Sequence, residues 1–325
     1  MPWRLPLLLG LICALLSAHV GSAWAQAYPV LGVRLIVPFT AGGAPDVIAR
    51  VLAQALSDQT GQSFVVENRP GADGVVGAQA VAQSTPDGYT LLVTSSSFAI
   101  NPSFHKNLPF DVIRDFEPVS SIASIDAYIL GVNPALPAHT VRDLVALASK
   151  PDAKISFASP GVGNSLHLAA ELFKSLTKTH MVHVPYRGAA QALTGLIAND
   201  VQVMFVTPPA SRPYIEGGKI RALGVTGTKR LDWLPNVPTL AETGVAGMEV
   251  MASWTGMFAP ARTPQPVIGR LHEHLVQAMT QPVRDRLTAL GVIPVGNAPA
   301  EFKPFVADQV RKIAEITRSA GIEPQ

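Results

Sequence analysis

The chain has 325 residues, with 25 lysines and arginines against 23 aspartates and glutamates, and a formal net charge of +2. Because this charge is close to neutral, the sequence gives no electrostatic reason to bind nucleic acid or an anionic membrane surface. A chain of this length can bury roughly 75% of its unfolded surface and usually divides into smaller units. We therefore expect two lobes.

Residues 1–25 are typical of a secretory signal peptide. Arg4 supplies the positive start, residues 5–16 form an apolar run, and the AWA tripeptide at 23–25 fits a cleavage site. The run is shorter than the roughly 20 residues of a spanning helix. Cys13, the only cysteine, lies in this run and lacks the preceding small residue of a lipoprotein signal. We expect a periplasmic protein that is not a lipoprotein and has no disulfide.

Residues 33–56 predict a strand, a glycine-rich loop and a helix. The apolar run 35–37 is too short for a helix, whereas apolar residues recur with a 3.6-residue period over 47–56. Backbone amides of the loop would lie at the positive end of the helix dipole, where anions bind. The alternative is that the glycines only permit a tight turn. The candidate ligand contacts here are Thr40, Ala41, Gly42 and Gly43.

Residues 154–176 repeat this layout, with a strand at 155–158 and an amphipathic helix after the loop. Neither loop carries a lysine, arginine or carboxylate before its helix begins. Two similar half-sites far apart in the sequence suggest two lobes that face one ligand. The candidate contacts in this loop are Ser159, Gly161, Gly163, Asn164 and Ser165, of which the last two are alternatively only helix caps.

Strands and helices alternate along the rest of the chain. Strand, helix and strand with short links predict parallel pairing and right-handed crossovers. Ligands of such sheets bind at the carboxyl ends of the strands, which adds Asn68, Ser95 and Ser96 to the candidates. We expect further strands at 63–67, 89–94, 119–123, 128–132, 182–184, 201–206, 220–225 and 249–259, and helices at 75–83, 141–148, 189–198, 267–279, 282–290 and 300–320, with a proline-broken helix near Tyr214.

This order predicts an α/β protein with two mostly parallel sheets flanked by helices. Residues 26–125 and 246–325 form the first expected lobe, and residues 126–245 form the second. The chain would pass twice between the lobes, which makes a two-crossing hinge.

Five other side chains have both a functional and a structural interpretation. Tyr186 and Arg187 follow a strand end, where a guanidinium can bind a carboxylate in bidentate fashion or form a surface ion pair. His167 would bind ligand or pack its helix, and Trp254 would wall the pocket or fill the hinge. Asp46 is expected to stabilise its helix through the dipole rather than to contact ligand.

Enzyme and metal motifs are missing from the sequence. The run at 161–163 begins like a dinucleotide fingerprint, but Leu166 stands where the last glycine belongs. Nucleophile-elbow and phosphate-loop motifs do not occur. His272 and His274 are two residues apart on a helix, so they point in different directions and cannot chelate one metal. We expect no enzyme, no cofactor and no metal.

The chain resembles the extracytoplasmic solute receptors of the tripartite tricarboxylate transporter, also called Bug-type receptors. The matching segments follow one another through the whole chain after residue 25. They are PFxAGGxxDxxAR at 38–50, ENRPGAxG at 67–74, DGYTLL at 87–92, SPGxGNSLHLAAELF at 159–173, HVPYRG at 183–188 and WxGxFAPA at 254–261.

This resemblance implies a two-lobed type II periplasmic binding fold that closes on a small carboxylate, namely a di- or tricarboxylate, an amino acid or an aromatic acid. It also implies that loops 40–43 and 159–165 hold the ligand, that the receptor is a monomer, and that its partners are integral-membrane permease subunits. A receptor for a signalling system is the alternative. The effector domain of a transcription factor lacks the expected DNA-binding N-terminus, and an exported hydrolase or lyase using Ser165 and His167 has poor spacing.

Overall fold

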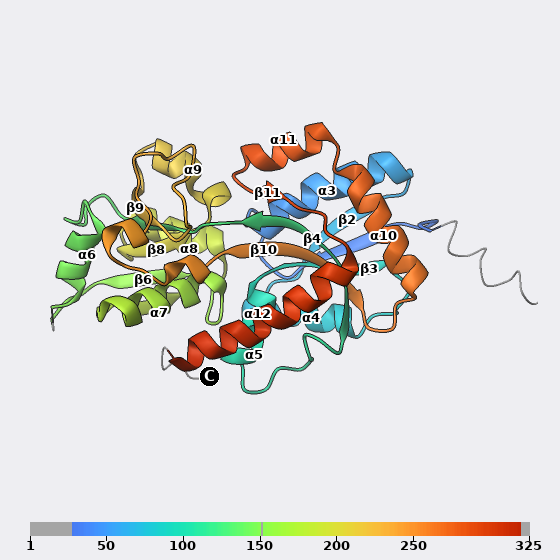
Figure 1. Cartoon of the computed structure of the whole chain (residues 1–325), viewed down its shortest axis with the longest axis horizontal. Coiled ribbons are helices and arrows are strands. Elements are labelled where there is room, and N and C mark those ends of the chain that lie inside the picture. The colour runs from blue at the N-terminus through green and yellow to red at the C-terminus, as the bar shows by residue number, and fades with distance from the viewer. Residues whose placement is uncertain (1–27, 151, 320–325) are drawn as a thin grey trace, which may run out of the picture.

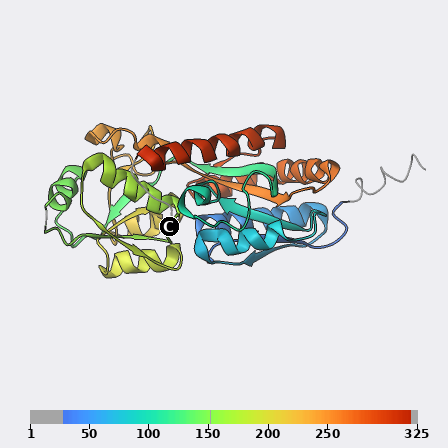
Figure 2. The same cartoon turned by 90° about the horizontal axis from the view of Figure 1, so that it is seen from below.

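The structure is a computed structural model that describes residues 28–150 and 152–319. The expected signal peptide therefore lies outside the described residues. Within them, two helix-covered β-sheets lie end to end along the long axis of the molecule (Figures 1 and 2). None of the helices in these residues has both the length and the apolar character needed to cross a membrane.

The first sheet has the strand order β11-β4-β10-β3-β1-β2. The alternation of side chains along β1 sends Leu35 and Val37 to one hydrophobic core and Ile36 to the other. Helices α3, α10 and α11 cover the first face, and α4, α5 and α12 cover the second. The strands are β1 (Val33–Val37), β2 (Phe64–Asn68), β3 (Thr90–Ser95), β4 (Phe116–Ile125), β10 (Ser253–Pro260) and β11 (Ile293–Pro294); the helices are α3 (Ala44–Thr60), α4 (Val75–Ala82), α5 (Ser97–Phe104), α10 (Gln265–Ala278), α11 (Gln281–Ala289) and α12 (Pro299–Ser319).

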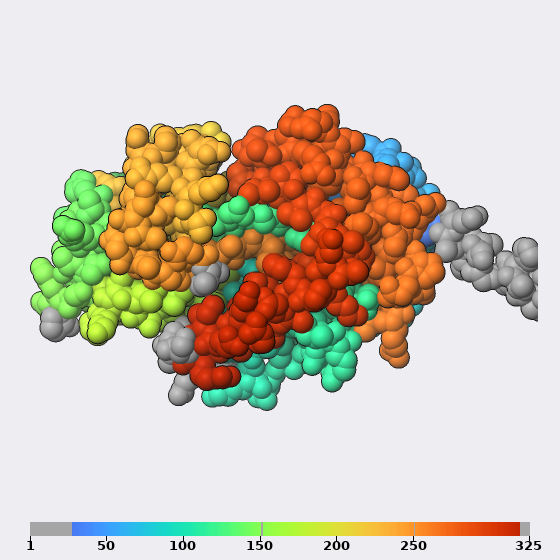
Figure 3. All heavy atoms as spheres, viewed as in Figure 1, coloured from blue at the N-terminus to red at the C-terminus, as the bar shows by residue number. Residues whose placement is uncertain are grey.

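The second sheet has the order β7-β6-β8-β5-β9. Its strands are β5 (Ile129–Val132), β6 (Ser156–Ser159), β7 (Val182–Pro185), β8 (Val203–Val206) and β9 (Arg221–Val225), with helices α6 (Val141–Ala148), α7 (Ser165–Thr177), α8 (Ala189–Ala198) and α9 (Pro208–Glu216). The short helical turns η1 (Ala72–Gly74), η2 (Ala241–Thr243) and η3 (Met248–Val250) complete the chain. Figure 3 shows α12 lying across the front of the molecule.

The two-lobed α/β fold is confirmed, with one correction to the sheets. The β1, β2 and β3 strands pair in parallel, as do β6, β7 and β8. The strands nearest the passage between the sheets, β4, β5 and β10, pair only antiparallel. Both sheets are thus mixed rather than mostly parallel, because each crossing strand enters its sheet from the opposite end. The lobe boundaries after residues 125 and 245 stay a prediction.

Sequence reasoning missed α5 and β11 and misjudged α9; the strand expected at 249–259 begins only at Ser253, because η3 occupies Met248–Val250. Helix α5 contains Pro102 and has no clear apolar stripe, and β11 is only two residues long. Helix α9 continues through Pro213 rather than breaking near Tyr214. The missing N–H of Pro213 removes one helical hydrogen bond, but the helix starts at Pro208 and is short, so only one turn is affected.

The two connections between the sheets are joined by one buried side chain. The Thr226 hydroxyl accepts a hydrogen bond from the Tyr128 amide at 2.8 Å and donates to the Met251 carbonyl at 2.7 Å. Tyr128 lies between β4 and β5, and Met251 lies just before β10. Thr226 therefore ties the first crossing to the second.

Replacing Thr226 with valine should destabilise this hinge. The shape is retained, but a buried N–H and a buried C=O lose their partner, and an unsatisfied buried group costs about 1–3 kcal/mol. We expect urea denaturation to give a free energy of unfolding lower by about 2 kcal/mol. The control is Thr194→Val, because the exposed Thr194 hydroxyl only bonds the Ala190 carbonyl of its own helix. If both variants lose the same free energy of unfolding, the proposed role of Thr226 in the hinge would be contradicted.

Candidate functional site

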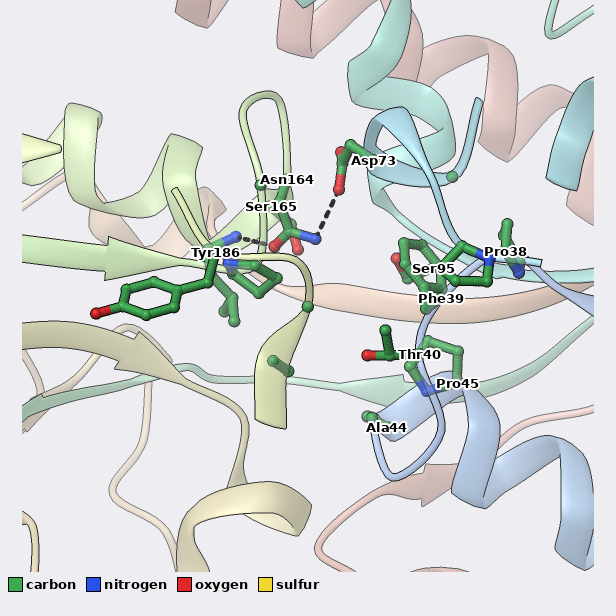
Figure 4. Close-up of a pocket in the computed structure, with 18 of the residues that line it drawn as sticks. Pro38, Phe39, Thr40, Ala44, Pro45, Asp73, Ser95, Asn164, Ser165 and Tyr186 are labelled. Atoms are coloured by element: carbon green, nitrogen blue, oxygen red, sulfur yellow. Dashed lines mark hydrogen bonds between the residues drawn. The ribbon is translucent and has the colours of Figure 1, made fainter. Parts of the chain in front are cut away.

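A cavity of about 640 Å³ lies between the two sheets. Its walls come from the loops that follow β1, β3, β6, β7 and β8, from η1, and from the start of β10 (Figure 4). The strand ends of both sheets therefore meet at one site, as expected for sheets of this type. Eight predicted residues line the cavity: Thr40, Gly43, Ser95, Gly161, Asn164, Ser165, Tyr186 and Arg187.

The other eight predicted residues are not among those that line the cavity: Ala41, Gly42, Asn68, Ser96, Ser159, Gly163, His167 and Trp254. Most of them hold the neighbouring loops in shape. Their contact with a ligand stays a prediction.

The loop before α3 is held by the carboxylate of Asp46. The Gly42 amide donates to Asp46 Oδ2 at 2.9 Å, and the Asn68 amide group donates to Oδ1 at 2.9 Å. Arg50 forms an ion pair with the same carboxylate. Burial acts to raise the pKa of Asp46, but the hydrogen bonds from Arg50 and the Gly42 amide outweigh it and hold the pKa below its usual range. The Gly42 amide is thus directed at Asp46 and not at the cavity.

The loop before α7 is held by two stacked histidines. His167 and His183 stack with ring centroids 4.0 Å apart. His167 Nδ1 accepts the Gly163 amide at 3.2 Å, and the Ser159 hydroxyl lies 2.7 Å from His183 Nε2. Burial, with the nearby positive Lys174 and the other histidine, lowers the pKa of His167 to about 3. His167 is therefore a neutral packing residue at ordinary pH.

Asn164 links the two lobes. Its side-chain oxygen caps α7 by accepting the Leu166 amide at 2.9 Å. Its side-chain nitrogen donates across the cleft to Asp73 Oδ1 at 3.0 Å and to the Ser97 hydroxyl at 3.2 Å. Figure 4 shows Asn164 and Asp73 facing each other. Ser97 also accepts the Ser165 amide at 3.2 Å, so the first amides of α7 are already used within the protein.

A second contact between the lobes joins Thr40 and Gly188. Gly188 has φ +118°, and a Cβ atom placed there would lie 2.2 Å from Thr40 Oγ1. Only glycine permits this approach of the β7–α8 loop to the β1–α3 loop.

The N-terminus of α8 is a candidate anion site that no sequence motif indicated. Gly188 caps this helix and supplies no side-chain hydrogen bond. Gly188, Ala189 and Gln191 all line the cavity, and the first amides of a helix have no partner within it. Arg187 directly precedes these residues, lines the cavity and makes no hydrogen bond or ion pair with the described residues. The positive charge of Arg187 therefore lies beside the positive end of the α8 helix dipole.

The hinge side of the cavity is rich in hydroxyl groups. The hydroxyls of Ser96 and Ser253 are 3.0 Å apart, and Ser253 begins β10. Trp254 is 4% exposed and packs edge-on against Phe302 of α12, with ring centroids 5.4 Å apart. Trp254 therefore packs into the core between β10 and α12.

Sequence reasoning missed several lining residues, among them Asp73, His105, Gln191, Thr207, Ser253 and Thr255. Asp73 is the variable position of the ENRPGAxG segment and has φ 52°, a left-handed conformation. Nothing in the local sequence indicated that η1 would face the loop before α7. Across residues 28–150 and 152–319, no cluster of three or more histidine, cysteine or acidic side chains could hold a metal ion.

Two lobes, a two-crossing hinge and a ligand-sized cavity at the strand ends define a solute-binding protein. Residues 48–322 match the family described as "Tripartite tricarboxylate transporter family receptor". The chain belongs to this family of receptors, which are binding proteins and not enzymes. Among its relatives, Protein BugT of Bordetella pertussis is 35% identical over 300 residues, which is 91% of each chain.

Solved structures agree with this assignment. The periplasmic binding protein BugD has a TM-score of 0.87 at 33% identity and covers 92% of this chain and 100% of its own. A protein of R. palustris solved with adipate has a TM-score of 0.87 at 34% identity, with coverage of 92% and 100%. MatC of Rhodopseudomonas palustris, solved with malate, has a TM-score of 0.82 at 28% identity, with coverage of 89% and 99%.

Gly188→Ala should keep the lobes apart, because its Cβ atom and Thr40 Oγ1 cannot occupy the same space. We expect small-angle X-ray scattering to give a larger radius of gyration than for the parent protein. Gly244→Ala is the matched control, since Gly244 also has positive φ, +92°, but has no atom within 4 Å of the added Cβ. An unchanged radius for Gly188→Ala would show that the loops adjust without opening.

The stacked histidines should make stability depend on pH. Burial lowers the pKa of His167 to about 3 and that of His183 to about 4, from the ordinary 6.5. The unfolded chain therefore binds more protons between pH 6.5 and 4, and the free energy of unfolding should fall as the pH decreases through this window.

The measurement is urea denaturation at several pH values from about 7 down to about 5, a range chosen so that few carboxylates titrate. His183→Gln should reduce the pH dependence by about one proton, and the exposed His180→Gln should leave it unchanged. If the free energy of unfolding of His183→Gln has the same slope against pH as that of the parent protein, His183 is not a source of the pH dependence.

Proposed function

We propose that the protein is a periplasmic receptor that captures a small organic acid between its lobes and delivers it to the permease of a tripartite tricarboxylate-type transporter. Family membership supports the receptor role. The solved relatives that hold adipate and malate support a carboxylate as the ligand. The signal-peptide pattern of residues 1–25 supports export.

The single observation that carries this proposal is the pairing of Arg187 with the N-terminus of α8. A cation without an anionic partner and helix amides without a capping side chain line one cavity. A carboxylate satisfies both, because guanidinium and backbone N–H groups each form charge-assisted hydrogen bonds with it. Thr40, Ser95 and Ser165 add neutral polar groups to the same walls.

The remaining walls explain how a ligand would be retained and released. Pro38, Phe39, Pro160, Val162 and Leu166 give the cavity apolar surface, which excludes water from the charged contacts. Closure of the two lobes would complete this enclosure, and reopening would expose the ligand again. A receptor that must hand over its ligand needs such a reversible arrangement.

Calorimetric titration of the purified protein with small mono-, di- and tricarboxylates tests the proposal. We expect at least one acid to bind, and Arg187→Gln to weaken its binding at least tenfold, because a hydrogen bond to a charged group contributes about 1.5–3 kcal/mol. Arg142→Gln is the control, since this exposed arginine on α6 removes the same charge outside the cavity.

Two results would count against the proposal. If no carboxylate binds, the receptor role for organic acids fails. If an acid binds equally well to the parent and to Arg187→Gln, the anion site is elsewhere in the protein.

A further inference from the structure

Asp73 is the only carboxylic acid side chain among the described residues that line the cavity. It belongs to η1, which follows β2, and its backbone has φ 52° and ψ 40°. The left-handed backbone brings this side chain to the cleft, where Gly161 of the opposite lobe approaches it; a Cβ atom at Gly161 would lie 3.9 Å from Asp73 Oδ1. A carboxylate in the wall contrasts with the neutral site that the two loop sequences predicted.

The carboxyl group of Asp73 is poorly satisfied by the protein. Oδ1 accepts one neutral hydrogen bond, from the Asn164 side chain, and the buried Oδ2 has no partner among the described residues. An ionised carboxylate offers about four acceptor positions, and leaving them unused in a buried place is costly. Burial raises the pKa of Asp73 well above its usual range, and the Asn164 bond opposes this only in part.

The rest of the lining contains one cation. Arg187 is the only lysine or arginine among the lining residues, and Asp73 forms no ion pair with it. The remaining titratable groups are Tyr186 and His105, and burial lowers the pKa of His105, which favours the neutral imidazole. The cavity thus presents one guanidinium group and one carboxyl group that form no ion pair with each other, and burial without a cationic partner favours the neutral form of the carboxyl group.

We propose that Asp73 makes the receptor selective for zwitterionic acids, in which the ligand carries an ammonium group beside its carboxylate. The inference rests on the proposed function, because Arg187 and the α8 N-terminus must bind the carboxylate. The ammonium group donates hydrogen bonds to the Asp73 carboxyl group, and its positive charge favours the ionised form of that group. An acid without a donor leaves the Asp73 carboxyl group without this additional partner.

Matched ligands that differ at one carbon atom test this selectivity. Succinate, malate and aspartate carry hydrogen, hydroxyl and ammonium at the same position, and adipate and 2-aminoadipate form a second pair. We expect calorimetry to show that each amino acid binds at least tenfold more tightly than its unsubstituted acid, a difference of about 1.4 kcal/mol.

Asp73→Asn should remove this preference while retaining the acceptor for Asn164. Asparagine tolerates left-handed backbone, so the variant should fold, and Asp73→Gly, which tolerates it equally, provides a second test. We expect the amino acids to lose at least tenfold in affinity, about 1.4 kcal/mol, and the unsubstituted acids to change little. Asp58→Asn, which removes an exposed charge on α3, should retain the parent preference.

The outcomes separate this inference from the proposed function. The unsubstituted acids could bind as tightly as their amino counterparts and still lose affinity in Arg187→Gln. This result would overturn the role of Asp73 and leave the receptor role intact. If malate binds with the same affinity as aspartate, any hydrogen-bond donor is sufficient, and this result would overturn the assignment of an ammonium group. A preference for amino acids that survives both Asp73 variants would refute Asp73 as its source. Failure of every acid to bind would overturn both proposals.

Discussion

The side chain of Asn164 is the contact on which the geometry of the cleft depends. Its oxygen fixes the start of α7, and its nitrogen reaches Asp73 and Ser97 in the other lobe. One amide group therefore sets the conformation of a loop and the separation of two lobes. The close approach of Thr40 and Gly188 limits the cleft at a second point. Between these contacts lies the cavity, whose shape follows from how far the lobes can approach.

The charges of the cleft are arranged in two different ways. Asp46 is an ionised carboxylate whose hydrogen-bond partners lie in its own lobe. The two stacked histidines are neutral because burial lowers their pKa values. Asp73 Oδ2 has no partner and Arg187 forms no ion pair among the described residues, and both residues line the cavity. Residues of the first kind build the loops, and those of the second kind are available to a ligand. Whether a polar residue near the cleft builds a loop or can meet a ligand therefore depends on whether the protein already satisfies its polar groups.

Much of the fold was predictable because each element carries its own signal. The two glycine-rich loops, the apolar period of α3 and α7 and the short strands that precede them are local features, and the structure places them within a few residues of the expected positions. The same logic failed for α5, which has no apolar stripe, and for the sheet pairing of β4, β5 and β10. Strand direction at a crossing depends on where the chain re-enters a sheet, which no local pattern records.

The sequence by itself determined the two-lobed α/β architecture, the receptor family and the presence of loops suited to an anion, because periodicity, turn residues and motifs are local. Only the tertiary structure decided which groups face the cavity. Gly42 and Gly163 direct their amides to Asp46 and His167, while the α8 N-terminus and Asp73 line the cavity instead. The physical reason is that a donor or acceptor is open to a ligand only when nothing else in the folded chain satisfies it, and those partners come from distant segments.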